Sequence, residues 1–246
     1  MAAPAITVIT PVLNGMPYLQ DAIESVIAQQ YAPLEMIVVD DGSRDGSGAM
    51  ARGVDICRVL RTPGIGPAAA RNVGIKASTS DLLVFLDADD MLGPSLIRSS
   101  VEALLRAPDA GFAQGCIQNF TTKPDGTMNL FTSAYRFINL GSGVWRRSVF
   151  EAVGLFDECL RLCEDLDFVM RCWERDIQKI PVECLLFYRR HAGNMTSGLK
   201  GADCGTLHAY RKRIERIRNG DYDPNRPRRV SWPDYLGMPP QSMDLE

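Results

Sequence analysis

Short apolar runs alternate with helical patterns through the first hundred residues, and this alternation restricts the fold more than any other feature. The apolar runs, rich in β-branched residues, cover residues 5–10, 34–39, 57–60 and 82–86. The segments between them, at 17–30, 46–52 and 67–77, carry apolar residues at helical spacing or a high alanine content. Consecutive strand, helix and strand segments form right-handed units with parallel strands. The alternation therefore predicts an α/β fold: a mostly parallel, doubly wound sheet with helices on both faces.

Polar side chains follow three of the predicted strands at the point where each strand ends. They are Asn14 after the first strand, Asp40 and Asp41 after the second, and Asp87, Asp89 and Asp90 after the strand at 82–86. In open sheets of this kind, ligands bind beyond the carboxyl ends of the strands. We therefore expect a binding site where these side chains converge.

The cluster Asp87, Asp89 and Asp90 has two readings at this stage. Like charges packed this closely disfavour each other's ionisation, and a hard divalent cation such as Mg²⁺ compensates for the repulsion. Alternatively, the acids favour the N-terminus of a helix predicted to begin near Gly93-Pro94-Ser95. The cluster alone does not separate a metal site from a helix cap.

Two other segments near the strand ends also leave alternatives open. Asp40-Asp41-Gly42-Ser43 is ordinary turn chemistry, but an acid there is also suited to bind a base or ribose. Residues 64–69 imitate the G-x-G-x-x-A dinucleotide fingerprint, although Pro67 and the charged preceding strand count against it. Arg71, on the helix that follows, suits either a phosphate contact or a surface ion pair.

The second half of the chain adds a possible base and a possible metal ligand. Glu164, Asp165 and Asp167 fall in the first turn of a predicted helix, where the helix dipole explains acids without catalysis. A carboxylate on such a rigid element is also what removal of a proton from an acceptor hydroxyl requires. His191 follows Arg189 and Arg190 at the end of a predicted strand, where it suits a metal ligand, a diphosphate contact or a solvated side chain.

The composition indicates a soluble, cytoplasmic protein without a general affinity for nucleic acid. The net charge is −3, and seven scattered cysteines form no CxxC pair. No signal peptide precedes the first strand and no apolar run approaches the length of a membrane span. Basic residues outnumber acids between positions 189 and 229. This segment suits a phosphate-bearing substrate, peripheral contact with the inner face of a membrane, or a solvated helix.

Taken together, the motifs resemble the family-2 glycosyltransferases, with their nucleotide-diphospho-sugar transferase (GT-A) fold. The resemblance rests on residues 7–14, 37–43, 66–74, 85–90, 153–158, 164–167 and 188–191, which occur in the family's order. It implies a GT-A domain at 1–200, with a nucleotide-binding half at 1–110 and an acceptor and catalytic half at 111–200. A basic helix and a Pro-rich, irregular tail are expected at 201–246.

The resemblance also implies a role for each matching residue. The donor-binding residues would be Pro11, Val12, Asn14, Asp40, Asp41, Arg71, Asp87 and Ala88. Asp87-Ala88-Asp89 matches the family's D-x-D, so Asp89, with Asp87 and His191, would bind Mg²⁺ or Mn²⁺, and Arg189 with its neighbours would add positive charge for the leaving group. Asp165 would be the catalytic base, with Glu164 as the alternative and Asp167 structural; Asp90 would cap the following helix.

The implied enzyme is an inverting, metal-dependent glycosyltransferase of polysaccharide biosynthesis that moves a sugar from a nucleotide sugar, expected to carry UDP, to a carbohydrate or lipid-linked acceptor. The Gln-x-x-Arg-Trp motif of processive synthases is absent after Asp167, so single additions are expected. The alternatives are a sugar nucleotidyltransferase and a non-catalytic nucleotide-sugar-binding protein. The sequence leaves the acceptor and the oligomeric state open, with residues 131–142 and the basic segment expected to shape the acceptor site.

Overall fold

A computed structural model describes residues 3–195, 197 and 205–237 of the 246-residue chain. The strands are β1 (Ile6–Val12), β2 (Leu34–Asp40), β3 (Cys57–Arg61), β4 (Leu82–Phe85), β5 (Met91–Leu92), β6 (Ala110–Thr122), β7 (Met128–Leu130), β8 (Gly143–Arg146) and β9 (Gln178–Arg189). The helices are α1 (Leu19–Ile27), α2 (Ser47–Arg52), α3 (Pro67–Ala77), α4 (Leu96–Arg106), the 3-10 helix η1 (Leu140–Ser142), α5 (Arg147–Val153), α6 (Glu164–Glu174), α7 (Thr206–Arg218) and α8 (Trp232–Leu236).

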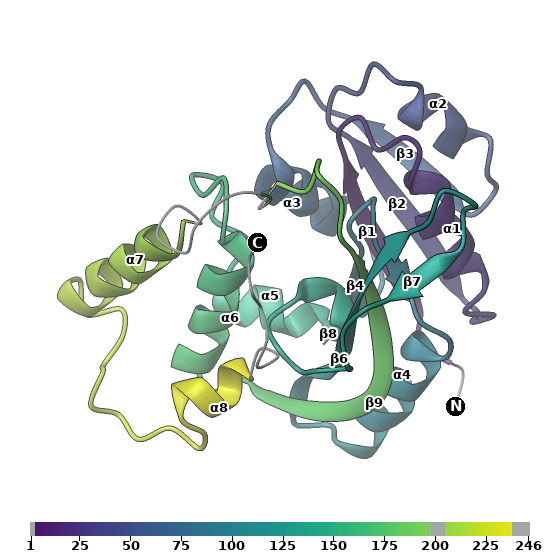
Figure 1. Ribbon diagram of the computed structural model, residues 1–246. Helices are drawn as coiled ribbons and strands as arrows, with labels where there is room; N and C mark the ends of the chain where they lie inside the picture. Colours follow the sequence, from purple (N-terminus) through teal and green to yellow (C-terminus); the bar gives the residue numbers. More distant parts are fainter. Residues whose placement is uncertain (1–2, 196, 198–204, 238–246) are drawn as a thin grey trace.

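One curled sheet runs through the described chain in the order β3-β2-β1-β4-β8-β6-β9-β5, with β7 paired to β6 (Figure 1). The strands of the first half, β1 to β4, are parallel, as the βαβ alternation predicts. In the second half β8 runs antiparallel to β4 and β6, whereas β9 runs parallel to β6. The predicted α/β fold class is confirmed, and the antiparallel pairs are confined to the later strands.

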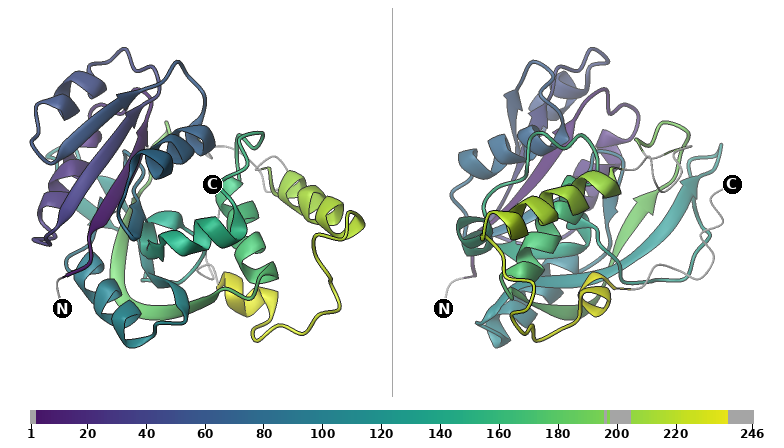
Figure 2. Two further views of the ribbon diagram at one scale, coloured as in Figure 1. Left: turned by 180° about the vertical axis from the view of Figure 1, so that it is seen from behind. Right: turned by 90° about the vertical axis from the view of Figure 1, so that its left-hand side faces the viewer.

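Helices cover both faces of this sheet (Figures 1 and 2). Because side chains alternate across a strand, Val8 and Val84 pack with α1, α2 and α4, whereas Ile9, Leu83 and Phe85 face α3, α5 and α6. The second face is rich in aromatic contacts, including Phe150 stacked on Phe168 with ring centroids 4.7 Å apart. Two apolar cores therefore hold the strands in place from opposite sides.

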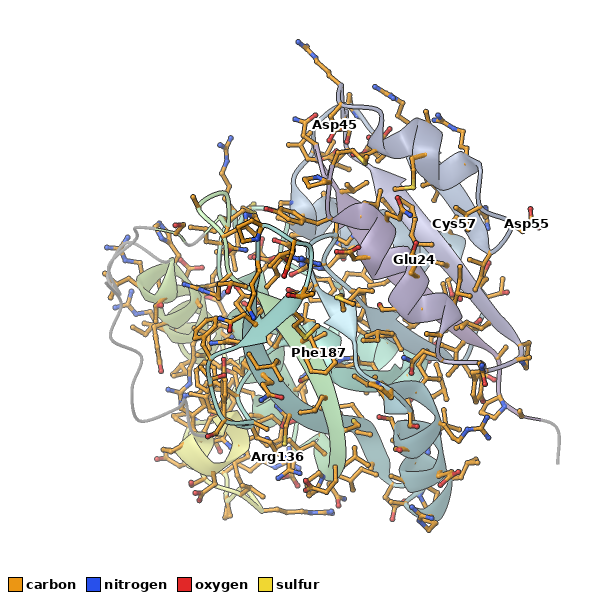
Figure 3. The ribbon with its side chains drawn as sticks, turned by 45° about the vertical axis from the view of Figure 1, so that its right-hand side comes forward. Glu24, Asp45, Asp55, Cys57, Arg136 and Phe187 are labelled. Carbon is orange, nitrogen blue, oxygen red and sulfur yellow. The ribbon has the colours of Figure 1, made fainter. Side chains whose placement is uncertain are left out.

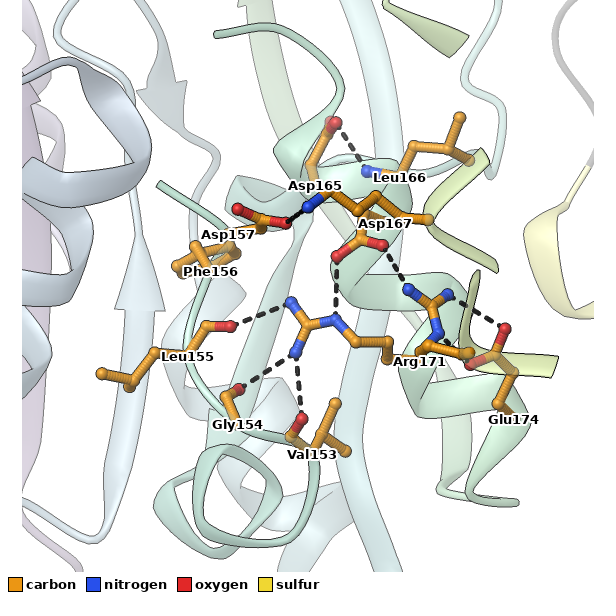
Figure 4. Close-up of polar contacts among 12 residues, drawn as sticks. Val153, Gly154, Leu155, Phe156, Asp157, Asp165, Leu166, Asp167, Arg171 and Glu174 are labelled. Carbon is orange, nitrogen blue, oxygen red and sulfur yellow. Dashed lines mark hydrogen bonds and ion pairs between the residues drawn. The ribbon is translucent and has the colours of Figure 1, made fainter. Parts of the chain in front are cut away.

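Acid–base pairs join α7 to α6 and to the loop that precedes α6. Arg216 of α7 contacts Asp167 at 2.9 Å and Glu174 at 2.7 Å, and Lys212 contacts Asp157 at 3.1 Å (Figure 4). Arg213 adds a longer pair with Glu174 at 3.6 Å. Several basic side chains of the predicted basic helix therefore face acids of the protein itself. No helix among the described residues is long and apolar enough to cross a membrane.

The tail contains one helix that the sequence analysis expected to be irregular chain. α8 buries Tyr235, which lies against Phe112 with ring centroids 6.2 Å apart, and the Tyr235 hydroxyl donates to the Ile177 carbonyl at 2.8 Å. Ser231 caps the helix by accepting a hydrogen bond from the Asp234 backbone N–H. The expectation for the tail was therefore wrong at α8, because a buried tyrosine anchors it. The rest of the expected tail, from residue 238, lies outside the described residues.

Candidate functional site

The predicted strand-end residues gather at one edge of the parallel half of the sheet. Val12 pairs with Asp40 across β1 and β2, and the Asp41 N–H donates to the Val12 carbonyl at 2.8 Å. The Leu86 N–H donates to the Ile9 carbonyl, which places the start of the Asp87–Asp90 turn beside β1. The structure therefore brings these residues together at the strand ends, as the sequence predicted, and their binding role stays a prediction.

Asp41 binds the turn at residues 64–66 through nearly all of its acceptor capacity. One carboxylate oxygen accepts from the N–H groups of Gly64 and Ile65 at 3.0 and 2.8 Å, and the other accepts from Gly66 at 2.7 Å. The hydroxyl of Thr62 adds a fourth bond at 2.6 Å. These N–H groups face Asp41, so the G-x-G sequence here serves a turn held by a carboxylate. Contact of Asp41 with a nucleotide base stays a prediction.

The neighbouring predicted donor residues are also tied to the protein. Asp40 is fully buried and contacts Arg61 at 3.1 Å, while Asn14 accepts a hydrogen bond from the Arg44 N–H at 2.9 Å. Val12 is buried in the core and Pro11 is partly buried beside it. These contacts fix the two loops that border the strand ends.

Arg71 connects the Asp87–Asp90 turn to the start of α6. It is nearly buried, and its guanidinium contacts Asp87 at 2.6 Å and Glu164 at 2.5 Å. The two carboxylates hold the pKa of Arg71 above its usual value despite burial, which acts in the opposite direction. The sequence left a phosphate contact and a surface ion pair open for Arg71. The structure favours an ion pair, which is buried and joins distant segments of the chain. The Asp87 side chain remains 42% exposed toward the site.

Asp89 and His191 lie together at the other side of the turn. His191 Nε2 is 3.0 Å from Asp89 Oδ2, the same oxygen accepts from the Asn194 amide at 3.0 Å, and Tyr18 lies over the imidazole at a ring-centroid distance of 4.5 Å. Burial first, and the charge of Asp87 second, raise the pKa of Asp89. The neighbouring negative charges of Asp87 and Asp89 make this position suitable for a cation.

A divalent cation fits this donor set only with ligands from outside the protein. Among the described residues no group of three or more His, Cys, Asp or Glu side chains is arranged to hold a metal ion. Asp89 and His191 would provide two ligands, and Asp87 is close by in sequence but engaged with Arg71. Mg²⁺ sites of this type are completed by substrate phosphates and water. The predicted metal ligands thus stay a prediction that the chemistry of the site supports.

The three acids at the start of α6 have different environments. Asp167 contacts Arg171 at 2.8 Å and Arg216 at 2.9 Å, which agrees with its predicted structural role (Figure 4). Glu164 is buried against Arg71. Among the described residues, the Asp165 carboxylate accepts a hydrogen bond from the adjacent Leu166 N–H at 2.7 Å and has no ion-pair partner. Burial, followed by the charge of Glu164, raises the pKa of Asp165 to about 6.

Asp90 and Arg189 differ from their predicted roles. Asp90 does not cap a helix: α4 begins at Leu96, and Asp90 accepts a hydrogen bond from the Arg189 backbone N–H at 2.9 Å. Arg189 does not face a leaving group either, because it is 2% exposed and pairs with Asp21 at 2.6 Å. Its guanidinium also donates to the Asp89 carbonyl at 2.8 Å. Sequence reasoning missed this role, and the only available signal was a basic residue ending an apolar strand.

The model of glycosyl transferase family 2 matches residues 7–154, which is more than half of the chain. The chain is 30% identical over 218 residues to the uncharacterised glycosyltransferase EpsJ of Bacillus subtilis, covering 78% of this chain and 63% of that protein. An uncharacterised glycosyltransferase of Rickettsia prowazekii is 28% identical over 213 residues, with 79% and 67% covered. The chain thus spans about two thirds of the length of these relatives.

Solved structures agree with the fold. S. aureus TarS 1–349 in complex with UDP-GlcNAc superposes with a TM-score of 0.68 at 18% identity, covering 89% of this chain and 68% of that one. The minor teichoic acid biosynthesis protein GgaA of Bacillus subtilis is 27% identical over 185 residues, covering 66% of this chain and 42% of that protein.

Proposed function

Because the chain belongs to glycosyl transferase family 2, a family of glycosyltransferases, we propose that it moves a sugar with inversion from a nucleotide-diphosphate sugar to an acceptor hydroxyl. UDP is the proposed nucleotide, since the superposed TarS structure holds UDP-GlcNAc. The relative GgaA is named for teichoic acid biosynthesis, which supports a role in building a cell-surface polysaccharide. We propose that the enzyme acts in the cytoplasm.

The contact of Arg71 with both Asp87 and Glu164 carries this proposal. A single buried guanidinium holds the D-x-D turn at 2.6 Å and the residue next to Asp165 at 2.5 Å. The donor-side acid and the proposed base are therefore held at neighbouring positions by a rigid link. A transferase needs this juxtaposition, because the acceptor hydroxyl must attack the donor sugar along a defined line.

In the proposed reaction Asp165 acts as the general base. Its carboxylate takes the proton of the acceptor hydroxyl while that oxygen forms a bond to the anomeric carbon. The bond between this carbon and the diphosphate oxygen breaks, its electron pair stays on the nucleoside diphosphate, and the configuration inverts. A pKa of about 6 leaves the carboxylate ionised at neutral pH and still basic enough to accept the proton.

Asp89 and His191, with Asp87 beside them, are the residues proposed to hold Mg²⁺ or Mn²⁺ together with the diphosphate. Such an ion, when bound, would stabilise the negative charge of the leaving group. Arg171 donates to Asp167 and to the carbonyls of Val153 and Leu155 (Figure 4). Its guanidinium therefore holds α5 and α6 together and does not serve to bind a polymer. This arrangement fits single additions.

The proposal is tested by measuring binding of UDP, GDP and dTDP with and without Mn²⁺, followed by turnover of the matching sugar nucleotides. We expect Mn²⁺-dependent binding of one diphosphate and a product whose anomeric configuration, read from the proton NMR coupling constant, is opposite to that of the donor. Retention of configuration, or binding that Mn²⁺ does not change, would contradict the mechanism. Asp89→Asn should abolish the metal dependence while the protein remains folded.

A further inference from the structure

A cavity of about 320 Å³ lies between the start of β9 and the chain that leads into α8. Among the residues that line it are Arg136, Trp173, Asp176, Lys179, Arg229 and Tyr235. We call it the β9–α8 cavity. Figure 3 shows Arg136 beside α8, at the opposite end of the view from Asp45, whose loop borders the strand ends. The cavity is therefore separate from the site described above.

The positive charge of Lys179 is not neutralised at this cavity. Its amino group donates to two uncharged oxygens, the Gln114 side chain at 2.6 Å and the Tyr235 carbonyl at 2.5 Å. No carboxylate of the described residues pairs with it. Burial and the nearby charge of Arg136 lower the pKa of Lys179 to about 8. An amine buried in this way gains stability from an anion that enters the cavity.

The acids around the cavity already have partners. Asp176 pairs with Arg229 at 3.2 Å, and Asp234 accepts a hydrogen bond from the Ser231 hydroxyl at 2.5 Å. Arg136 pairs with Glu183, whose side chain is 88% exposed and so compensates it only weakly. Three cations and two acids therefore line the cavity, and its net charge is +1.

We propose that the β9–α8 cavity binds a phosphate or carboxylate group carried by the acceptor. This inference rests on the proposed function and names the class of its second substrate as an anionic glycan or sugar phosphate. Asp165 and Trp173 lie on α6 eight residues apart, which is roughly 12 Å along the helix axis at 1.5 Å per residue. An elongated acceptor can therefore engage both ends of α6.

The test titrates the full chain with glucose 6-phosphate, glucuronate and neutral glucose by calorimetry. Saturating UDP and Mn²⁺ are present throughout, so that the probes do not occupy the diphosphate position. We expect both anions to bind at least about tenfold more tightly than glucose, since a charge-assisted hydrogen bond contributes about 1.5–3 kcal/mol. Comparable binding of glucose and glucose 6-phosphate would overturn the proposal.

Three variants assign the binding to the cavity. Lys179→Met should weaken glucose 6-phosphate binding about tenfold or more, whereas Lys179→Arg, which keeps the charge, should retain most of it. Lys76→Met, at an exposed lysine of α3, is the matched control and should bind like the wild type. Thermal unfolding of each variant checks that it is folded. Unchanged affinity in a folded Lys179→Met would overturn the proposal.

The same titrations separate this inference from the proposed function. If UDP binds but the anionic probes bind no better than glucose, the acceptor inference is overturned and the transferase proposal stands. If none of UDP, GDP and dTDP binds under any metal condition, the transferase proposal is contradicted, and so is the assignment of the anion to an acceptor.

Discussion

Glu164 and Asp165 are adjacent at the start of α6 but have different partners. This difference indicates which of the two is suited to act as the general base. Glu164 is paired with Arg71 at 2.5 Å, so its negative charge is compensated within the protein. Asp165 has no ion pair among the described residues and a pKa raised to about 6 by burial and by Glu164. An acid that is available and only weakly acidic is the better general base.

We expect Asp165→Asn to lower the rate of transfer by about 10²–10⁴ while leaving donor affinity nearly unchanged, because the amide cannot accept the proton. Turnover of the sugar nucleotide and binding of the nucleoside diphosphate measure the two effects separately. Asp167→Asn is the control on the same helix; it should act mainly on stability, because Asp167 contacts Arg171 and Arg216. Near-normal turnover of Asp165→Asn would transfer the role to Glu164.

The pH profile offers an independent check on this assignment. Asp165 accepts a proton only when ionised, so kcat/KM should rise with pH and reach half of its limit near pH 6. Glu164→Gln removes a negative charge that raises this pKa, and it leaves Arg71 less compensated. Both changes favour the ionised form, so the acidic limb should move to lower pH. A limb that stays in place would argue against Asp165.

The positions of single residues were predictable where they follow from strand ends, whereas their contacts with distant parts of the chain were not. The edge location of Asp41, Asp87 and Asp89 follows from strand ends in a parallel sheet. The contact of Arg71 with Glu164 joins residues 93 positions apart, and no local pattern encodes it. Asp41 likewise closes a turn 23 residues away.

Elements pack closely where glycine allows a helix to approach a strand. A Cβ atom at Gly74 of α3 would lie 2.4 Å from Ile9 Cγ2 of β1, which is closer than van der Waals contact. Gly74→Ala should therefore destabilise the protein by about 1–3 kcal/mol, since the core must shift to accept the methyl group. Urea unfolding measures the loss.

A double-mutant cycle with Ile9→Ala tests the cause. Removing the Ile9 side chain creates space, so the added cost of Gly74→Ala should shrink in the Ile9→Ala background. Strictly additive effects would show that the clash is not the source of the destabilisation.

The two helices α6 and α7 are joined through Arg216. Its guanidinium contacts Asp167 and Glu174, whose side chains are 2% and 4% exposed. We expect Arg216→Ala to destabilise the protein by about 2–4 kcal/mol, because two buried carboxylates each lose one partner and keep only Arg171 or the more distant Arg213. Arg218→Ala, at an exposed position of the same helix, should change the free energy of unfolding by less than about 0.5 kcal/mol. Equal effects in urea unfolding would contradict a specific role for Arg216.

Element boundaries were predictable where apolar periodicity was strong. β2, β4 and α3 begin and end within a few residues of the ranges expected from the sequence. α8 was missed because its five residues include Pro233 and Asp234 and have too few positions for a helical pattern. The helix is held in place by a tertiary contact instead, because Tyr235 packs in the core.

At the scale of the whole molecule, β9 joins the two halves of the fold. It runs parallel to β6 along its length, and its last residues reach the edge of the sheet that carries the proposed site. The sequence predicted a division into two halves at residue 110. In the structure, strands from both halves belong to one continuous sheet. Pairing of β6 with β9 is long-range, so sequence periodicity could not reveal it.

Arg189, the last residue of β9, is the contact that fixes this junction. Its guanidinium lies between the rings of Tyr18 and Phe120, 4.8 and 4.6 Å from their centroids. It pairs with Asp21 of α1 and donates to the Asp89 carbonyl. One buried side chain therefore links α1 of the first half, β6 and the proposed metal-binding turn, and His191 follows two residues later.

We expect Arg189→Met to destabilise the fold by about 3–5 kcal/mol and to weaken Mn²⁺-dependent UDP binding in the protein that remains folded. The Asp89 carbonyl loses its donor, and Tyr18, which packs on the His191 ring, loses its contact with the guanidinium. Asp21→Asn is the milder companion: its side chain is 45% exposed, and Arg189 keeps its other partners. This variant should lose less than about 1 kcal/mol of stability. Urea unfolding and calorimetric UDP titration at several Mn²⁺ concentrations measure both effects. If Arg189→Met binds UDP with the wild-type dependence on Mn²⁺, the residue stabilises the fold without positioning the site.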